Sequence, residues 1–576
     1  MAGTTTRFSL GSTSIRYTSS SVSVDLRSGQ GEAASRGLPF SVGGVWTALP
    51  ALLLTAYALV LRLAGTGRGL PYLHEWDEWF QVPPVLRMVL YHTLNPGIFI
   101  YGSLYYYLLL PVVYLHFLYL HALGAMTSMN DIVLTHPLVP GYGWYINYPS
   151  FYLWARAFTA LFGAATVYLT YRLGRAAFGR TVGLLAAAVL AVAPGAVYYA
   201  DTARVDVPEA CLTTSALLAG LAVMRRGLVR DYLIAGLLAG LAMSTKQTAV
   251  WVLPALVLAH VFHERRPALA DRRLALMIGA VVVGGLVGTP YLLIRPDLVR
   301  AGFGAQVGTY GVFSIPRPGE FMWHLALNLG YLVWPSQGGD WYVVPHTALG
   351  LVPGIAAVIG LVDGFARRPR VQAYLFTLPL LQLCFLARAN VVFTRNLAPV
   401  LPLAAIWAAL GAAWTWDRVA GLLTFEPRLR LKAMPPVAAV VVAALLVGPV
   451  RESAALAWWL NRHRDSRTQA VEWLRVHGPR GGVVAFELEL AWYLPDLDRL
   501  PFRVEWTDRA TPPSWYARHH IDLAVVGYRN PIHLRRRAAF FPPPRYLPSL
   551  VEETKFVPNS YPIIDPAILI VIPSEP

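Results

Sequence analysis

Long apolar runs alternate with short polar breaks along most of this 576-residue chain. A transmembrane helix needs about 20 consecutive apolar residues to cross the hydrocarbon core of a bilayer. Eleven runs approach that length, and we predict a membrane-spanning helix at each of them. The predicted spans are 45–66, 151–171, 181–199, 209–224, 231–245, 248–263, 273–294, 346–365, 371–387, 396–416 and 433–450.

One further run, at 103–123, is long and apolar enough to span but carries five Tyr and two His. Tyrosine prefers the boundary between membrane and water, so we predict a helix that lies along the outer interface. A spanning helix is the alternative. It would move every later basic loop to the opposite side of the membrane unless another crossing restored the order.

Short loops that follow alternate spans are rich in arginine, which is typical of the cytoplasmic side of a membrane protein. This pattern predicts a multi-pass protein of the plasma membrane with a cytoplasmic N-terminus. The stretches 67–150, 199–208, 295–345, 388–395 and 451–576 then lie outside. The basic clusters are Arg172, Arg175 and Arg180; Arg225, Arg226 and Arg230; His263 to Arg273; Arg367, Arg368 and Arg370; and Arg418, Arg428, Arg430 and Lys432.

Three regions follow from these patterns. Residues 1–44 are rich in Ser, Thr and Gly, and we predict a disordered cytoplasmic tail without a cleavable signal peptide. Residues 45–450 form a mainly α, polytopic helical bundle with its first outer loop at 67–150. Residues 451–576 have a mixed composition and predict a small extracytoplasmic α/β domain.

Within the C-terminal region, a capping box of Ser466 and Gln469 predicts a helix over 466–477 that ends at Gly478-Pro479. Alternating or apolar runs predict strands at 483–488, 521–527 and 568–572. Gly481-Gly482 precedes a strand and does not open a helix, so no nucleotide-binding loop is expected there. Structural support or acceptor docking is the role that we expect for this region.

Composition agrees with the membrane assignment, because 56% of the residues are hydrophobic and only 14% are charged. Soluble proteins carry about 25% charged residues. The net charge of +16 therefore reflects basic loops, and nucleic acid is not an expected partner. Cys211 and Cys384, the two cysteines, each lie inside an apolar run, which excludes a disulfide framework.

The densest polar cluster, His74-Glu75-Trp76-Asp77-Glu78-Trp79, follows the first span. A general base must lie within reach of the hydroxyl proton and must have a suitable pKa. Neighbouring acids and partial burial raise the pKa of a carboxylate toward that range. The cluster is therefore a candidate catalytic site at the membrane surface. The alternative is an interfacial aromatic anchor with solvated acids.

A second cluster, Asp201, Arg204, Asp206 and Glu209, lies in a short hinge between the third and fourth spans. Charges at such a depth are costly and indicate function by default. A helix cap with a local Asp–Arg pair is the alternative.

Three cations, Lys246, Arg388 and Arg395, lie at outer breaks between spans, where the positive-inside rule disfavours them. Together they indicate a bound anion such as a lipid-linked phosphate. Snorkelling side chains are the alternative.

Five motifs occur in an order that resembles a known family. They are Asp77-Glu78, residues 95–104 with Asn-Pro and Tyr-Gly-Ser-Leu, residues 203–208 (Ala-Arg-Val-Asp-Val-Pro), residues 236–246 ending in Ser-Thr-Lys, and residues 395–402 (Arg-Asn-Leu-Ala-Pro-Val-Leu-Pro). Over roughly 45–415 the chain resembles the GT-C glycosyltransferases of the protein O-mannosyltransferase and aminoarabinose-transferase type. Residues 465–474 resemble the tail domains of bacterial members. The family's His-Pro before the acidic pair is absent, because Glu75-Trp76 stand there.

The resemblance implies a polyprenyl-phosphate sugar as donor and a membrane lipid environment. It implies Asp77 as catalytic base with Glu78 beside it, and Asp206 as an orienting acid. It places Lys246 near the carrier phosphate, assisted by Arg395. We add Arg388 and Arg204 to the donor side, and His74, Tyr101 and Asp201 to the substrate side.

We therefore expect an inverting transfer of a sugar to a protein, lipid or envelope-glycan acceptor on the outer face. The phosphate leaving group needs no general acid. No cofactor is required by any ligand spacing, although a divalent metal ion at Glu75, Asp77 or Asp206 stays open. The alternative function is a transporter or lipid flippase, which predicts charges near the bilayer midplane and paired broken helices. A non-catalytic envelope assembly protein is a third interpretation.

Overall fold

The protein is seen in a computed structural model, which divides the chain into two units, Met1–Leu49 and Pro50–Pro576. The first unit holds an antiparallel pair of short strands, β1 (Ser9–Leu10) and β2 (Thr13–Ser14), and the start of α1. The predicted disordered tail falls almost wholly outside the described residues. The structure describes residues 9–10, 13–14, 42–73, 76–133, 146–264, 270–312, 314–335, 337–338, 342–343, 346–422, 427–462, 466–487, 500–507, 511, 513–528 and 567–571.

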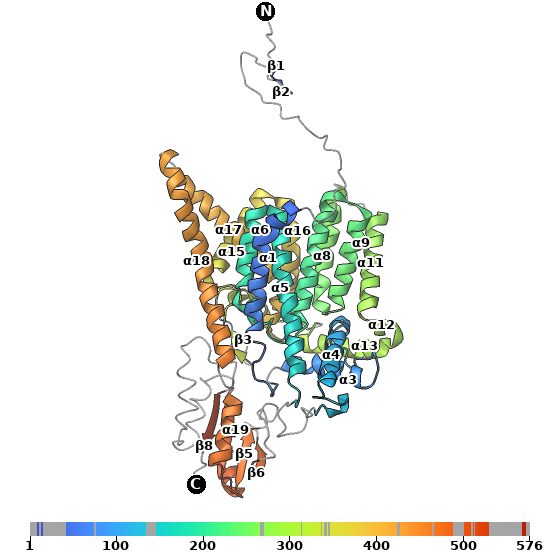
Figure 1. Ribbon diagram of the computed structural model, residues 1–576, viewed down its shortest axis with the longest axis vertical. Coiled ribbons are helices and arrows are strands. Elements are labelled where there is room, and N and C mark those ends of the chain that lie inside the picture. The colour runs from blue at the N-terminus through green and yellow to red at the C-terminus, as the bar shows by residue number, and fades with distance from the viewer. Residues whose placement is uncertain are drawn as a thin grey trace, which may run out of the picture. The chain divides into compact units, whose positions relative to one another are not determined.

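The second unit is dominated by long helices that run side by side (Figure 1). A helix lies at each of the eleven predicted spans. Four helices are long and apolar enough to cross a membrane by length and composition: α4, α8, α16 and the 436–458 part of α18. The helices at the predicted spans are α1 (Val42–Leu63), α5 (Ser150–Phe178), α6 (Arg180–Ala191), α8 (Asp206–Arg226), α9 (Val229–Met243), α10 (Val252–Glu264), α11 (Arg272–Gly288), α15 (Leu351–Arg367), α16 (Pro369–Arg388), α17 (Leu401–Leu422) and α18 (Pro427–Arg462).

Two predicted spans are shorter than expected, and proline is the reason in both. The span at 181–199 breaks into α6 and α7 (Pro194–Tyr198), because Ala193 before Pro194 takes an extended backbone conformation. The span at 273–294 ends at Gly288, ahead of Pro290, and a separate turn, α12 (Tyr291–Ile294), follows. Residues 199–205, which follow this break and α7, contribute to the candidate site described below.

The predicted outer loop 295–345 is partly helical, which the sequence interpretation missed. It contains α13 (Pro296–Tyr310) and α14 (Pro318–Tyr331), each with proline in its first turn. A short antiparallel pair, β3 (Gln337–Gly338) and β4 (Tyr342–Val343), follows them. α18 is also much longer than the predicted 433–450 span.

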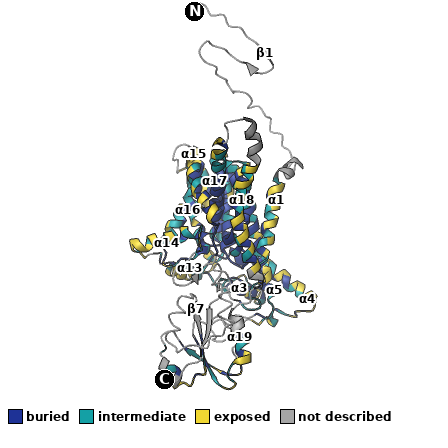
Figure 2. Ribbon diagram, turned by 90° about the vertical axis from the view of Figure 1, so that its left-hand side faces the viewer, coloured by how far each residue is buried: buried dark blue, intermediate teal, exposed yellow. Residues whose placement is uncertain are grey.

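The aromatic run at 103–123 forms α4 (Leu104–Ala122), which lies across one end of the bundle and not along the long helices (Figures 1 and 2). Its length and composition suit a crossing, yet its orientation supports the interfacial interpretation. The chain also returns to the face it left: Arg156 near the start of α5 donates to the carbonyl oxygens of Thr66 and Arg68 just after α1, at 2.7 and 2.8 Å. We call this face the site end.

The basic loops gather at the opposite end, as the charge pattern predicts. Arg225 donates to the carbonyl oxygen of Ala176, and Arg368 donates to that of Ala177 at 2.7 Å. Arg273 reaches the carbonyl oxygen of Gly227 at 3.2 Å. Arginines from three separate loops therefore contact the ends of neighbouring helices there, and we call this face the basic end.

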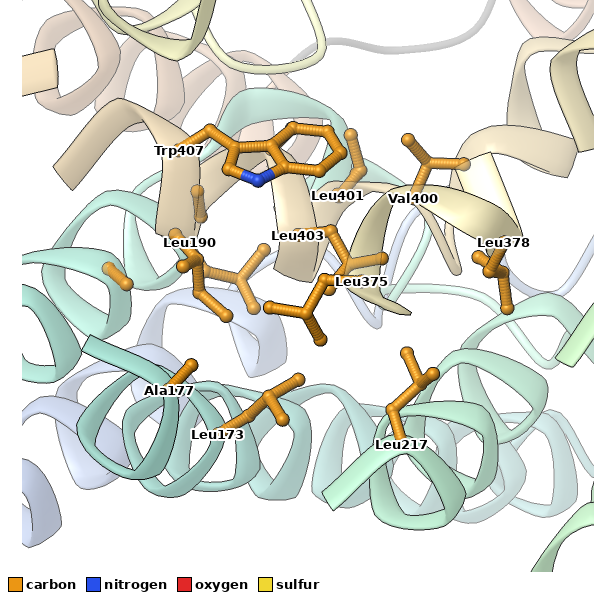
Figure 3. Packing of buried hydrophobic residues seen from close by; sticks show 14 of the residues in the cluster. Leu173, Ala177, Leu190, Leu217, Leu375, Leu378, Val400, Leu401, Leu403 and Trp407 are labelled. Carbon is orange, nitrogen blue, oxygen red and sulfur yellow. The ribbon is translucent and has the colours of Figure 1, made fainter. Parts of the chain in front are cut away.

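α17 is the centre of the bundle, because every residue from Leu401 to Ala412 is buried (Figure 2). Leu403 and Trp407 pack among aliphatic side chains from α5, α6, α8 and α16 (Figure 3). α15 approaches α17 so closely that a Cβ atom on Gly360 would collide with the carbonyl oxygen of Trp407. Glycine is thus required at this helix crossing.

The C-terminal region contains the predicted helix, α19 (Ser466–His477), and a four-stranded sheet of order β6-β5-β7-β8. The expected strands appear as β5 (Val483–Glu487), β7 (Leu523–Tyr528) and β8 (Ala567–Val571). β6 (Arg503–Thr507) and α20 (Pro513–Arg518) were not predicted, since the polar residues of β6 hide its alternation. β5 pairs in parallel with β6 and β7, and β7 pairs antiparallel with β8. Val484 and Phe486 pack against α19, whereas Ala485 and Ala524 pack with Tyr516 of α20.

The α15–α17 crossing makes a first prediction. Gly360→Ala should lower stability by about 1–3 kcal/mol, because the new methyl group meets backbone that cannot give way. Thermal unfolding in detergent measures the change. Gly279→Ala, within α11, is the matched control, since its Cβ would meet nothing within 4 Å. Equal unfolding temperatures for the two variants would contradict the packing described here.

Candidate active site

Four breaks between helices meet at the site end. Asp77 lies in α2 (Trp76–Trp79) of the first long loop, and Arg204 lies in the turn between α7 and α8. Lys246 follows α9 and precedes the short helix η2 (Gln247–Trp251). Arg395 lies in the short helix η3 (Thr394–Leu397), ahead of α17. The sequence predicted all four as site residues. Ion pairs join Asp77 to Arg204 and Arg395, and Asp206, the partner of Lys246, interacts electrostatically with both arginines, so we treat them as one cluster.

Asp77 is held between two arginines. Its Oδ2 atom accepts a hydrogen bond from Nη1 of Arg204 at 2.8 Å, and its Oδ1 atom lies 3.2 Å from Nη2 of Arg395. The Asp77 side chain is 13% exposed, against 4% for Arg204. Arg204 is itself fixed by Thr202, whose Oγ1 accepts from its Nε at 2.6 Å, and lies over the ring of Tyr199. The carboxylate is therefore oriented but still reachable from solvent.

Lys246 forms a second, more deeply buried ion pair. Its Nζ atom donates to Oδ1 of Asp206 and to Oδ1 of Asn396, both at 2.6 Å. A second carboxylate oxygen, Oε2 of Glu209, lies 4.0 Å away. Burial alone would lower the pKa of Lys246, but Asp206 and Glu209 outweigh it and hold that pKa above its usual value. Lys246 is thus a buried, permanently charged ammonium group.

The ion pairs join two groups that the sequence interpretation kept apart. It set Asp77, Glu78 and Asp206 on the side that activates the acceptor, and Lys246 and Arg395 on the side of the lipid phosphate. In the structure Lys246 lies against Asp206, and Arg395 lies against Asp77. Asp206 and Glu209 also belong to the first turn of α8 and not to a hinge loop. Buried charges are stable only when paired, which explains the alternation.

Glu78, unlike Asp77, cannot be reached from solvent. Its carboxylate is fully buried and forms a two-pronged ion pair with Arg156 of α5, with N–O distances of 2.8 and 2.7 Å. Its Oε1 also accepts from the backbone N–H of Ala203 at 2.9 Å. Both oxygens are occupied, so its geometry favours a positioning role over the predicted catalytic one. Arg156 is a residue that sequence reasoning missed.

The remaining predicted residues divide into two groups. Asp201 is buried with Oδ1 3.7 Å from Nη2 of Arg68, and Tyr101 is buried close enough to the cluster to interact with Asp77 and Arg395. Burial raises the pKa of Tyr101, so its hydroxyl stays protonated. Arg388 is exposed and donates to the carbonyl oxygen of Ser314 at 3.2 Å, so it is not joined to the cluster. His74 and Glu75 lie outside the described residues.

Asn396 and Tyr310 are further cluster residues that the sequence analysis did not select. Asn396 accepts from Lys246 and donates through Nδ2 to the hydroxyl of Tyr310 at 3.0 Å. Its place directly after Arg395 within an apolar motif is the sequence signal that points to it. Within the described residues, no group of three or more His, Cys, Asp or Glu side chains is arranged to hold a metal ion.

Known proteins share this architecture. The family model described as dolichyl-phosphate-mannose-protein mannosyltransferase matches residues 152–289, from α5 to the end of α11. ArnT from Cupriavidus metallidurans bound to undecaprenyl phosphate superposes with a TM-score of 0.50 at 15% identity, over 92% of this chain and 98% of that chain. The same protein in the apo state gives 0.50 at 14% identity, over 93% and 99%. No curated protein matches by sequence.

The family match and the shared fold confirm the resemblance that the motifs indicated. The match to the family model covers residues 152–289, and the likeness to ArnT, at 15% identity, shows a common fold. The matched segment contains Arg204, Asp206 and Lys246, which are part of the cluster described above.

The Glu78–Arg156 pair makes a second prediction. Glu78→Ala should lower stability by about 3–5 kcal/mol, because it leaves a buried guanidinium without its carboxylate. Asp297→Ala, which breaks the exposed Arg295–Asp297 pair, should leave the unfolding temperature unchanged. If Glu78→Ala loses turnover but keeps its unfolding temperature, the result would support the predicted catalytic role of Glu78 and contradict a positioning role.

Proposed function

We propose that this protein is an inverting glycosyltransferase that moves a sugar from a polyprenyl-phosphate carrier to an acceptor on the outer face of the membrane. The observation that carries the proposal is the position of Asp77, a reachable carboxylate between Arg204 and Arg395, in one cluster with Lys246. The family model's description and the fold shared with ArnT, which was crystallised with undecaprenyl phosphate, support a lipid-phosphate donor.

In this mechanism Asp77 removes a proton from the acceptor hydroxyl or amine, and the freed atom attacks the anomeric carbon. The bond from that carbon to the phosphate oxygen breaks, and the carrier phosphate leaves with the electron pair. Lys246 and Arg395 stabilise its negative charge. A phosphate is already a good leaving group, so no general acid is needed. One displacement inverts the anomeric centre.

The ion pair between Asp77 and Arg395 adds a coupling to this scheme. An arriving carrier phosphate competes with Asp77 for the guanidinium of Arg395. Asp77 then keeps Arg204 on Oδ2, while Oδ1 becomes available to an acceptor proton. Donor binding thus frees the base.

The outer-face assignment and the plasma-membrane location rest on the charge pattern. Arginines of the predicted cytoplasmic loops meet at the basic end, and the cluster lies at the site end. We retain 1–44 as a cytoplasmic tail, 45–450 as the catalytic bundle and 451–576 as an extracytoplasmic domain for support or acceptor docking. A flippase would place charges near the middle of the helices, whereas Asp206, Lys246 and Arg395 lie at helix ends.

The base assignment makes a third prediction. Asp77→Asn keeps the shape of the side chain but removes the proton acceptor, so turnover should fall about 100- to 10,000-fold. Sugar transfer from undecaprenyl-phosphate sugars in proteoliposomes measures it. Binding of sugar-free undecaprenyl phosphate should persist in the variant. Full turnover by Asp77→Asn would rule out the assignment.

The two outer arginines supply a fourth prediction with an internal control. Arg395→Ala should weaken binding of sugar-free undecaprenyl phosphate about 10- to 100-fold, through loss of a charged hydrogen-bond donor. Arg388→Ala removes an equal charge outside the cluster and should leave the affinity unchanged. Equal losses in both variants would show a diffuse electrostatic effect and contradict a phosphate site at Arg395.

A further inference from the structure

His346 lies among three tyrosines at the site end. Its ring centroid is 4.5 Å from that of Tyr198, 6.0 Å from Tyr199 and 5.8 Å from Tyr331. The His346 side chain is completely buried. Tyr198 is the last residue of α7, Tyr199 directly follows that helix, and Tyr331 is the last residue of α14. An apolar packing role would account for the rings but not for the imidazole nitrogens.

The two nitrogens of His346 are in different situations. Nδ1 lies 3.1 Å from the carbonyl oxygen of Thr347 and 3.2 Å from the hydroxyl of Tyr331. Both neighbours of Nδ1 belong to the protein, because this nitrogen either donates to the carbonyl oxygen or accepts from the hydroxyl of Tyr331. Nε2 has no partner of either kind among the described residues.

Nothing among the described residues donates a hydrogen bond to this buried Nε2 atom. Buried polar atoms in native proteins nearly always have a partner, and leaving one unmet costs about 1–3 kcal/mol. A hydroxyl group suits this nitrogen in either tautomer, because a hydroxyl both donates and accepts hydrogen bonds.

The position of His346 is held firmly by its neighbours. The N–H and hydroxyl of Thr347 both donate to the carboxylate of Glu452 in α18, at 2.6 and 2.8 Å. The N–H of Ala348 donates to the carbonyl oxygen of Tyr331 at 2.8 Å. A ring fixed in this way presents Nε2 in a set direction, as a binding group requires.

The aromatic cluster adjoins the proposed active site. The hydroxyl of Tyr199 lies 2.5 Å from Oγ1 of Thr394, the residue before Arg395. Arg204, which donates to Asp77, covers the Tyr199 ring at 5.6 Å. Arg68 covers the Tyr198 ring at 5.0 Å, and Tyr198 is only half-buried. Tyr199 therefore contacts Arg204, the partner of the proposed base Asp77, and it also contacts the residue next to Arg395.

We propose that Tyr198, Tyr199, Tyr331, His346 and Arg68 form the subsite for the sugar ring of the donor, with Nε2 of His346 hydrogen-bonded to a sugar hydroxyl. This inference rests on the proposed function and names its sugar-recognition residues. A sugar ring offers apolar C–H faces to aromatic side chains and hydroxyl groups to a polar atom such as Nε2. The donor is favoured over the acceptor because the cluster adjoins Arg395, where the attached phosphate would lie.

The test compares carriers with and without a sugar. Binding of bare undecaprenyl phosphate and of undecaprenyl phosphate bearing mannose, glucose, arabinose or aminoarabinose is measured on the full-length protein. Wild-type protein should prefer at least one sugar-bearing carrier about tenfold over the bare one. His346→Phe keeps a ring but removes Nε2, so that preference should disappear. Loss of one hydrogen bond corresponds to a change of about tenfold. The affinity of this variant for the bare carrier should stay the same. His346→Gln, which can accept through its amide oxygen, should restore part of the preference.

His260→Phe is the matched control, because His260 is also buried and bonded to a tyrosine, Tyr232, at 2.8 Å, but lies in the later half of α10. It should keep the sugar preference. The proposal is overturned if His346→Phe keeps the preference, if His260→Phe loses it equally, or if wild-type protein prefers no sugar. A higher acceptor KM with unchanged donor preference would also overturn the donor assignment. Failure of the proposed function would appear separately, as wild-type protein that transfers no sugar or as full turnover by Asp77→Asn.

Discussion

The arrangement of the site end depends on one buried ion pair, Glu78 with Arg156. Both side chains are at most 1% exposed, where an unpaired charge would be strongly destabilising. Arg156 also binds the carbonyl oxygens of Thr66 and Arg68, and Glu78 accepts from the N–H of Ala203. The pair therefore joins the end of α1, the short helix α2, α5 and the turn before α8. Asp77, next to Glu78, is thereby held opposite the arginine of that turn.

Around this anchor the charges alternate, and that alternation suits a site that must receive an anion. In a medium of low dielectric constant, opposite charges attract strongly and single charges are costly. Asp206 therefore neutralises Lys246, and Asp77 contacts Arg395. In the proposed mechanism an incoming phosphate would change these partnerships and would not enter a vacant positive patch. In the proposed mechanism this exchange links donor binding to release of the base, so the ion pairs serve both stability and timing.

A second layer supports the first. The segment 346–349 is bound by α14 through backbone hydrogen bonds, by α7 through the N–H of Gly195, and by α18 through Glu452. The next residue of α18, Ser453, donates to the carbonyl oxygen of Val192 at the break between α6 and α7. α18 thus holds both segments that bring His346 and Tyr199 together.

The sequence by itself determined where the helices lie, that charged breaks alternate with basic loops, and which residues, Asp77, Arg204, Lys246 and Arg395, to select as candidates. Apolar length and arginine content are local properties, readable within one segment. Tertiary structure alone decided the partners, because these come from distant segments: Glu78 meets Arg156 78 positions away, and Lys246 meets Asn396 150 positions away. Glu78 is fully buried and Asp77 is not, although they are neighbours in sequence. Arg395 contacts Asp77, whereas Arg388 lies outside the cluster. The unmet nitrogen of His346 likewise exists only because three tyrosines close around it in the folded chain.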